Sequence, residues 1–139
     1  MKSNKIENNY QTKLYLYKNG EDIVSKKVEE WLYIHHFLYQ IITPRTLSKL
    51  HILQILNNSE FGFEEVLAPR NFPGAKTLKE INELTVEELI HEILKKPIML
   101  KKTILFDDIN LLVGFNPDEI RKFIPRSYRA IAQRELNGK

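Results

Sequence analysis

The sequence predicts an α/β fold in which a mixed sheet of about four strands is interrupted by a helical insertion. Three observations lead to this prediction. A strand, helix, strand pattern occupies residues 14–42, two short apolar runs flank a turn over residues 104–113, and residues of about 45–97 carry helical signals. The two ends of the domain are therefore expected to build the sheet, with the helices inserted between them.

The first unit begins with the β-prone residues 14–17, which end at the turn-forming pair Asn19-Gly20. Apolar side chains then recur at helical spacing from Ile23 to Leu32, with charged residues at the other positions. Residues 37–42 are apolar and partly β-branched, which indicates a second strand. A strand, helix, strand order implies a parallel pair joined by a right-handed crossover.

The middle of the chain predicts helices of different lengths. Thr85 and Glu88 have the spacing of a capping box at the start of the last helix, and Pro97 marks the end of that helix. The expected elements are a helix over 47–56, a short helix over 64–67, a loop over 69–74, a turn near 78–81 and a helix over 86–94.

The end of the domain predicts a hairpin followed by a capped helix. The apolar runs 104–106 and 111–113 flank the turn-forming sequence Asp-Asp-Ile-Asn, which is typical of a tight antiparallel hairpin. Asn116 can accept backbone N–H bonds as a helix cap, and Pro117 suits the first helical position. We therefore expect a helix to begin here.

Composition indicates one globular domain. The chain has 139 residues, of which 42% are hydrophobic and 28% charged, and it is long enough to bury a core. Residues 1–12 are polar and predict a flexible arm, residues 13–134 a single domain, and residues 135–139 a flexible tail. No apolar run approaches the roughly 20 residues of a membrane span, so we expect a cytoplasmic protein.

The sequence contains no cysteine, which excludes disulfides, thiolate zinc sites and thiol catalysis. No two of its four histidines are spaced to share one helical turn, so we expect helix-end or surface histidines and neither metal nor cofactor. The net charge of +3 is mildly basic and too small to establish nucleic-acid binding.

Three segments, in order, resemble one family. "LYLYKNGEDIVSKKVEEWL" is similar to the first strand, active-site loop and first helix of the Spx family, "QILNNSEFGFEEVLAPRN" to its helix, glycine loop and helix, and "KKTILFDDINLLVGFNPDEIRKFIPRSYR" to its closing segment. Spx proteins are thioredoxin-like bacterial regulators related to the glutaredoxin-linked arsenate reductases, the ArsC proteins. The resemblance covers residues of about 13–134 and implies a thioredoxin-like fold.

The resemblance also implies that the redox site is degenerate. Aligning Trp31-Leu32 with the family's Trp-Leu puts Asp22 and Ser25 at the two positions of the Cys-x-x-Cys motif. Neither residue can form a disulfide, and we expect Asp22 to cap the helix that begins at Ile23. The family's Arg-Pro pair before the third strand corresponds to Lys102-Thr103, which keeps the charge but loses the bidentate fork of arginine.

A protein-binding surface is the second implication. Gly62 aligns with the glycine at which Spx proteins bind the C-terminal domain of the RNA polymerase α subunit, although a lone glycine between helices can also serve only a positive φ angle. Asn57 replaces the family's usual arginine before this loop. The expected partner-binding residues, partly exposed as a patch, are Tyr17, Asn57, Gly62, Arg70 and Lys102.

Basic residues are concentrated near the end of the chain. They are either a solvated face or, as a secondary hypothesis, contacts to promoter DNA phosphates beside the polymerase. These residues are Arg121, Lys122, Arg126, Arg129 and Arg134.

The resulting prediction is a non-enzymatic, Spx-like transcription regulator of the stress-response type, monomeric when free, that binds the polymerase α domain without a cysteine switch. Two alternatives remain open. One is an arsenate reductase-like enzyme that uses a group other than cysteine, and the other is a degenerate scaffold that binds another protein.

Overall fold

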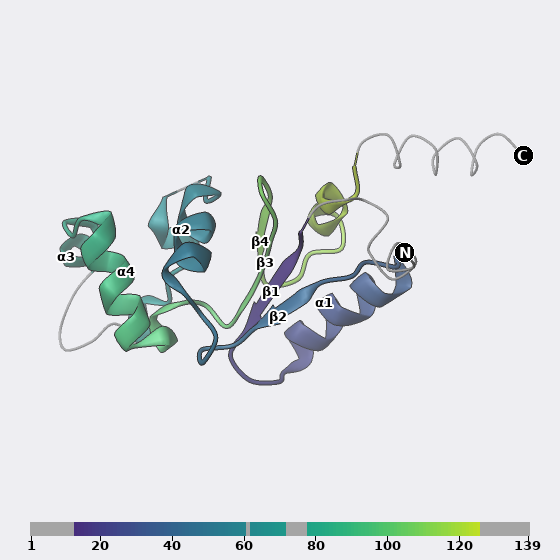
Figure 1. The fold of residues 1–139 in the computed structure, drawn as a ribbon, viewed down its shortest axis with the longest axis horizontal. Coiled ribbons are helices and arrows are strands. Elements are labelled where there is room, and N and C mark those ends of the chain that lie inside the picture. The colour runs from purple at the N-terminus through teal and green to yellow at the C-terminus, as the bar shows by residue number, and fades with distance from the viewer. Residues whose placement is uncertain (1–12, 61, 72–77, 126–139) are drawn as a thin grey trace, which may run out of the picture.

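Four strands form one mixed sheet in the computed structural model, which describes residues 13–60, 62–71 and 78–125 (Figure 1). The strand order is β2-β1-β3-β4. The central strand β1 (Tyr15–Lys18) pairs in parallel with β2 (Gln40–Ile42) and antiparallel with β3 (Thr103–Phe106), which continues into β4 (Leu111–Val113) as a hairpin. The predicted parallel pair and the predicted hairpin are both confirmed.

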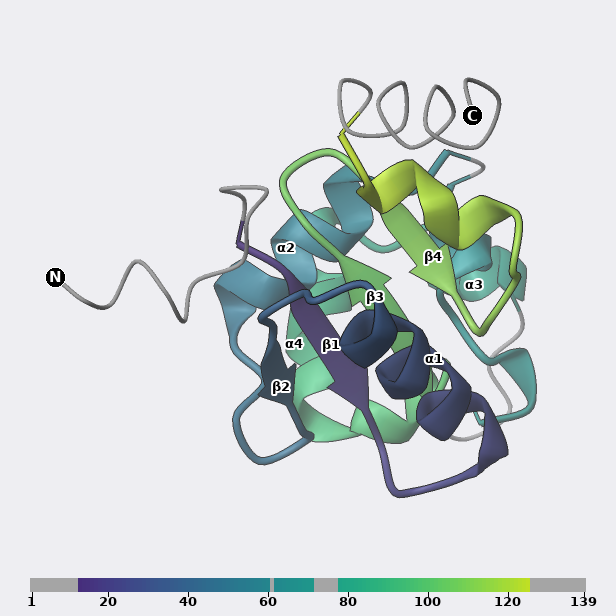
Figure 2. The ribbon, with the colours of Figure 1, turned by 90° about the vertical axis from the view of Figure 1, so that its right-hand side faces the viewer.

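The two faces of the sheet support two separate cores. Leu16, Leu105 and Leu112 lie in register across three strands and pack on the face covered by α1 (Ile23–Ile34) and by the short 3-10 helix Glu119–Phe123 (Figure 2). Because strand side chains alternate, the neighbouring residues point to the opposite face. There they pack against the helical insertion, as Tyr17, Ile104, Phe106 and Leu111 do.

The insertion contains three α-helices, α2 (Lys49–Asn57), α3 (Leu78–Asn82) and α4 (Val86–Lys95), within the described ranges. The predicted capping box at α4 is confirmed: Glu88 N–H donates to Thr85 Oγ1 at 3.1 Å, and Thr85 N–H donates to Glu88 Oε1 at 2.8 Å. Pro97 follows within two residues of the helix end and opens a 3-10 turn.

Two predicted helices are only 3-10 turns. The expected helix over 64–67 is the turn Phe63–Glu65. Asn116 Oδ1 accepts the N–H groups of Asp118 (2.8 Å) and Glu119 (2.9 Å), but it does so in a turn before the helix, whose N-cap is Asp118 and which runs only over Glu119–Phe123. It stops because Ile124 precedes a proline, which favours the extended backbone that Ile124 adopts (ψ 123°).

The second strand is also shorter than the predicted run of residues 37–42. Phe37 N–H donates to Leu32 O at 2.9 Å and completes the end of α1, while the Phe37 ring stacks on Trp31 with centroids 5.6 Å apart. Residues 37–39 therefore belong to the turn after α1, and pairing with β1 begins only at Gln40.

A pair of side-chain amides fastens the insertion to the sheet. Gln54 Nε2 and Asn58 Nδ2, near the end of α2, both donate to the main-chain oxygen of Asp107 at 2.8 Å. Asp107 begins the turn between β3 and β4 and is 3% exposed. The end of α2 is thus held directly against the hairpin.

A second connection runs through the segment before β3. Lys101 N–H donates to Val66 O at 2.9 Å, and Ala68 N–H donates to Met99 O at 2.7 Å, around an antiparallel bridge between Leu67 and Leu100.

None of the helices in the described part of the chain combines the length and apolar character that a membrane span requires. The predicted arm (1–12) and tail (135–139) lie outside the described residues.

Helix α1 ends in a Schellman motif with an unusual residue. His36 has φ +62°, its N–H donates to Tyr33 O at 3.1 Å, and the next N–H donates back to Leu32 O. Glycine is the usual residue at this left-handed position because a Cβ atom is strained there. Histidine therefore carries a local conformational cost in this turn.

Substituting His36→Gly should raise the free energy of unfolding by about 0.5–1 kcal/mol, because relief of the left-handed strain outweighs the added freedom of the unfolded chain. Urea unfolding measures the change. Lys27→Gly, on the exposed middle of the same helix, is the control and should lower the free energy by about 1 kcal/mol. A loss of stability in both variants would contradict the left-handed conformation at residue 36.

Candidate functional site

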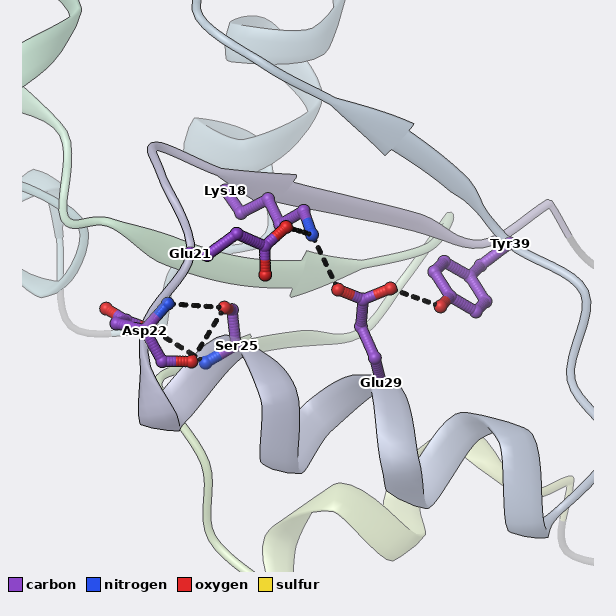
Figure 3. A network of polar contacts seen from close by, with 6 residues as sticks. All are labelled: Lys18, Glu21, Asp22, Ser25, Glu29 and Tyr39. Carbon is purple, nitrogen blue, oxygen red and sulfur yellow. Dashed lines mark hydrogen bonds and ion pairs between the residues drawn. The ribbon is translucent and has the colours of Figure 1, made fainter.

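The loop between β1 and α1 carries the two positions where the resemblance placed the redox cysteines. Asp22 is the N-cap of α1, with Ser25 N–H donating to Asp22 Oδ1 at 2.8 Å (Figure 3). The Ser25 hydroxyl completes a capping box, because Asp22 N–H donates to Ser25 Oγ at 3.2 Å and Ser25 Oγ donates to Asp22 O at 3.1 Å. The predicted cap is confirmed, and the part played by Ser25 is new.

The Asp22 carboxylate fills the place at which a helix N-terminus would stabilise a thiolate or an oxyanion. The Ser25 N–H lowers the pKa of Asp22, and the charge of Lys102 lowers it further. Lys102 is held next to this loop because Asn19 N–H donates to its carbonyl oxygen at 2.9 Å. The two predicted positions are thus near enough for the charge of Lys102 to stabilise the Asp22 carboxylate, whose main partner is the Ser25 N–H.

Among the described residues no peptide bond is cis, so Lys102-Thr103 has the ordinary trans geometry. Within these residues, too, no group of three or more histidine, aspartate or glutamate side chains is arranged to hold a metal ion. Ser25 is fully buried and its hydroxyl is engaged in the capping box. Both side chains at the predicted redox positions are therefore engaged in capping α1.

A part-buried ion-pair network lies beneath this loop. Lys18, at the end of β1, is nearly buried; its Nζ contacts the Glu21 carboxylate and lies 2.6 Å from Glu29 Oε2 (Figure 3). The Tyr39 hydroxyl donates to Glu29 Oε1 at 2.6 Å. One carboxylate on α1 therefore ties the helix to β1 on one side and to the segment before β2 on the other.

The charges of this network reinforce one another. Burial alone would lower the pKa of Lys18, but the bonds and charges of Glu21 and Glu29 outweigh burial and raise that pKa. Burial likewise opposes ionisation of Glu29, but hydrogen bonds from Lys18 and Tyr39 lower its pKa. Local sequence patterns do not reveal this network, although a lysine inside a central strand signals a need for a charged partner.

Tyr17 is the one predicted contact residue that the structure contradicts. Its side chain is 0% exposed, because it lies in register with Ile42 and Ile104 on the face that the insertion covers. Burial raises the pKa of Tyr17 to about 12. The residue is part of the core, and the prediction that it is partly exposed was wrong.

Gly62 lies at an open surface. It has φ +87°, and a Cβ atom added there would meet nothing within 4 Å among the described residues other than its chain neighbours. Next to it is a shallow hollow of about 290 Å³ lined by Gly62, Phe63, Glu64 and Asn82, in which Asn82 Nδ2 donates to Glu64 Oε2 at 3.3 Å. The backbone therefore needs a glycine here, and the same glycine leaves room for an approaching molecule.

The remaining predicted contact residues, Asn57, Gly62, Arg70 and Lys102, are all exposed. Asn57 is the last residue of α2, five positions before Gly62 in the chain. Arg70 and Lys102 flank the pairing of residues 66–68 with 99–101, and its antiparallel register puts them toward opposite ends. Lys102 follows Lys101, whose N–H donates to Val66 O, four residues after Gly62.

The structure places two of the predicted basic residues, and it shows the contacts of two histidines. Arg121 is exposed and Lys122 half-buried in the last 3-10 helix, while Arg126, Arg129 and Arg134 lie outside the described residues. The His35 ring packs on Trp31 at 4.2 Å, and burial, with the charge of Arg121, lowers its pKa. His51 Nδ1 accepts the Ser48 N–H at the start of α2, as expected of a helix-end histidine.

Comparisons with known proteins agree with this architecture. The ArsC family model matches residues 15–123. The global transcriptional regulator Spx of Streptococcus mutans is 38% identical over 106 residues, which cover 75% of this chain and 77% of the relative. Spx of Streptococcus agalactiae is 34% identical over 123 residues, covering 82% and 89%.

Solved structures support the fold. An ArsC family related protein from Bacteroides fragilis superposes with a TM-score of 0.62 at 17% identity, covering 79% of this chain and 96% of that one. A YffB protein superposes with a TM-score of 0.60 at 23% identity, covering 81% and 99%. With a matching family model over most of its length and relatives named as Spx regulators, this chain belongs to the ArsC family and has a thioredoxin-like fold without cysteine.

Proposed function

We propose that this protein is a transcription regulator of the Spx kind that binds the C-terminal domain of the RNA polymerase α subunit. It acts as a binding module in the cytoplasm, catalyses no reaction and has no cysteine switch. The single observation that carries this proposal is the open surface at Gly62, where a positive φ angle and an adjoining hollow leave the backbone accessible. The family resemblance supplies the identity of the partner.

The chemistry of the β1–α1 loop supports binding over catalysis. A reductase must admit an oxyanion and attack it with a nucleophile, but the Asp22 carboxylate already occupies the helix N-terminus. Lys102, which would attract the oxyanion, is instead close enough to stabilise Asp22. An enzyme of the arsenate reductase type is therefore the weaker alternative.

The partner surface centres on the loop after α2. Absence of a side chain at Gly62 permits a close approach of the partner's backbone, and Phe63 gives the hollow an apolar wall. Asn57 supplies a neutral amide at the edge of this surface. Arg70 and Lys102 are peripheral contacts in this proposal, and Arg121 and Lys122 are available for promoter phosphates in the polymerase complex.

Binding in this proposal does not depend on the redox state. Redox-sensing Spx proteins carry Cys-x-x-Cys on this loop, whereas this chain has a capping box there and the Lys18–Glu29 ion pair beside it. Neither interaction responds to an oxidant. The protein is therefore competent to bind whenever it is present, and its abundance sets its activity.

Gly62→Arg should raise the dissociation constant for the α C-terminal domain about tenfold or more, because the new side chain blocks the hollow. Isothermal titration calorimetry measures it. The control is Gly20→Arg, at another open glycine with φ +93°, which carries the same backbone strain in the loop between β1 and α1. Equal weakening by both variants, or no weakening by Gly62→Arg, would contradict contact at Gly62.

Asn57→Arg should tighten binding about three- to tenfold, since it restores a charge able to make a charge-assisted hydrogen bond. The gain should shrink when the salt concentration is raised, because screening weakens an exposed charge. Titrations at low and high salt test both statements. Unchanged affinity at low salt would remove Asn57 from the proposed surface.

Asp22→Gly should create an anion site, because it empties the N-terminus of α1 while glycine remains a tolerable N-cap. Millimolar sulfate should then raise the melting temperature of the variant more than that of the wild-type protein, at matched ionic strength. Differential scanning fluorimetry gives the readout. Equal responses of the two proteins would show that Asp22 does not occupy an anion position.

A further inference from the structure

The turn of the β3–β4 hairpin, residues 107–110, lies beside the C-terminal end of α2 (Figures 1 and 2). The contact is direct, because Gln54 Nε2 and Asn58 Nδ2 each donate to Asp107 O at 2.8 Å. Asn58 immediately follows Asn57 and leads into the Gly62 loop. The hairpin turn and the proposed partner surface therefore sit at the same end of the molecule.

This turn is held in one conformation. Asp107 Oδ1 accepts the N–H groups of Ile109 (3.0 Å) and Asn110 (2.7 Å), and Asp107 N–H donates to Asn110 O at 3.1 Å. The Asn110 amide also reaches Lys122 O at 3.4 Å. A partner that binds here would lose little free energy in ordering the turn, because it is already ordered.

The side chain that this turn presents is apolar. Ile109 is 78% exposed and belongs to neither of the two buried clusters. Its neighbours Asp107, Asp108 and Asn110 are residues that favour turns, whereas a β-branched isoleucine has no such preference. Neither the turn nor the core thus accounts for an isoleucine at this position.

The proposed surface at Gly62 is too small by itself. A stable complex of standard size buries about 800 Å² on each partner. Four of the described residues line the hollow beside Gly62, and a partner seated on it must also contact neighbouring elements to bury that area. Of these, the hairpin turn is fixed to the end of α2 and offers a rigid apolar side chain.

We propose that Ile109 is an apolar anchor of the same interface, and that it packs against an apolar side chain of the partner domain that docks on the Gly62 loop. This inference rests on the proposed function and adds a second contact to it. The hydrogen bonds from Gln54 and Asn58 to Asp107 O fix the hairpin turn relative to the end of α2, and so set the distance between Ile109 and the Gly62 loop. Asp107 is thus a positioning residue, and Ile109 makes the contact.

Site-specific cross-linking can test this inference. The sequence has no cysteine, so a single introduced cysteine is the only thiol that the reagent can label. Ile109→Cys and, as a control, Leu50→Cys are labelled with a maleimide benzophenone, mixed with purified RNA polymerase and irradiated. Leu50 is 74% exposed in the first turn of α2, at the other end of that helix. The label at 109 should cross-link to the α subunit, and the label at 50 should not.

Affinity supplies the second measurement. Ile109→Ser should weaken binding to the α domain about tenfold, whereas Leu50→Ser should leave it unchanged. Urea midpoints check that both variants fold. If Ile109→Ser binds with full affinity, or if positions 109 and 50 cross-link equally, the inference is wrong. The effect of Gly62→Arg on affinity then still tests the proposed function independently. No binding by the wild-type protein would instead reject the proposed function, and this inference with it.

Discussion

Two side-chain amides that share one carbonyl oxygen hold the layers of this protein in place. Gln54 and Asn58 reach from α2 to the main chain of Asp107, so the insertion and the hairpin keep one relative position. Both donors and the acceptor are part-buried, where an unmade hydrogen bond costs about 1–3 kcal/mol. The position of the Gly62 loop follows from this contact, because the loop begins where α2 ends.

The start of α1 shows how a reactive position can become a structural one without a change of fold. Asp22 and Ser25 satisfy the first turn of the helix with side-chain oxygens. The same N–H groups and helix dipole that would activate a thiol now stabilise a fixed carboxylate. The part-buried Lys18–Glu29 pair, with Tyr39 as a third member, adds a tie that links helix and sheet.

The sequence predicted what depends on neighbouring residues. The strand, helix, strand unit, the hairpin, the caps at Asp22 and Thr85, and the positive φ angle of Gly62 all follow from local patterns. What it missed depends on contacts between distant segments. To predict that Tyr17 is buried, one must know which face of the sheet the insertion covers. To predict the Lys18–Glu29 pair, one must know how α1 is placed along the sheet.

The central strand has consequences for the order in which the chain acquires its structure during synthesis. Strand β1 finds its parallel neighbour β2 within the first third of the chain, but its antiparallel neighbour β3 comes only after the whole insertion has been made. Closing so large a loop is slow, since its entropy is lost before the pairing is gained. On the ribosome, one edge of β1 therefore stays open until the last third emerges, and a nascent protein with an unsatisfied central edge needs protection from pairing with other chains.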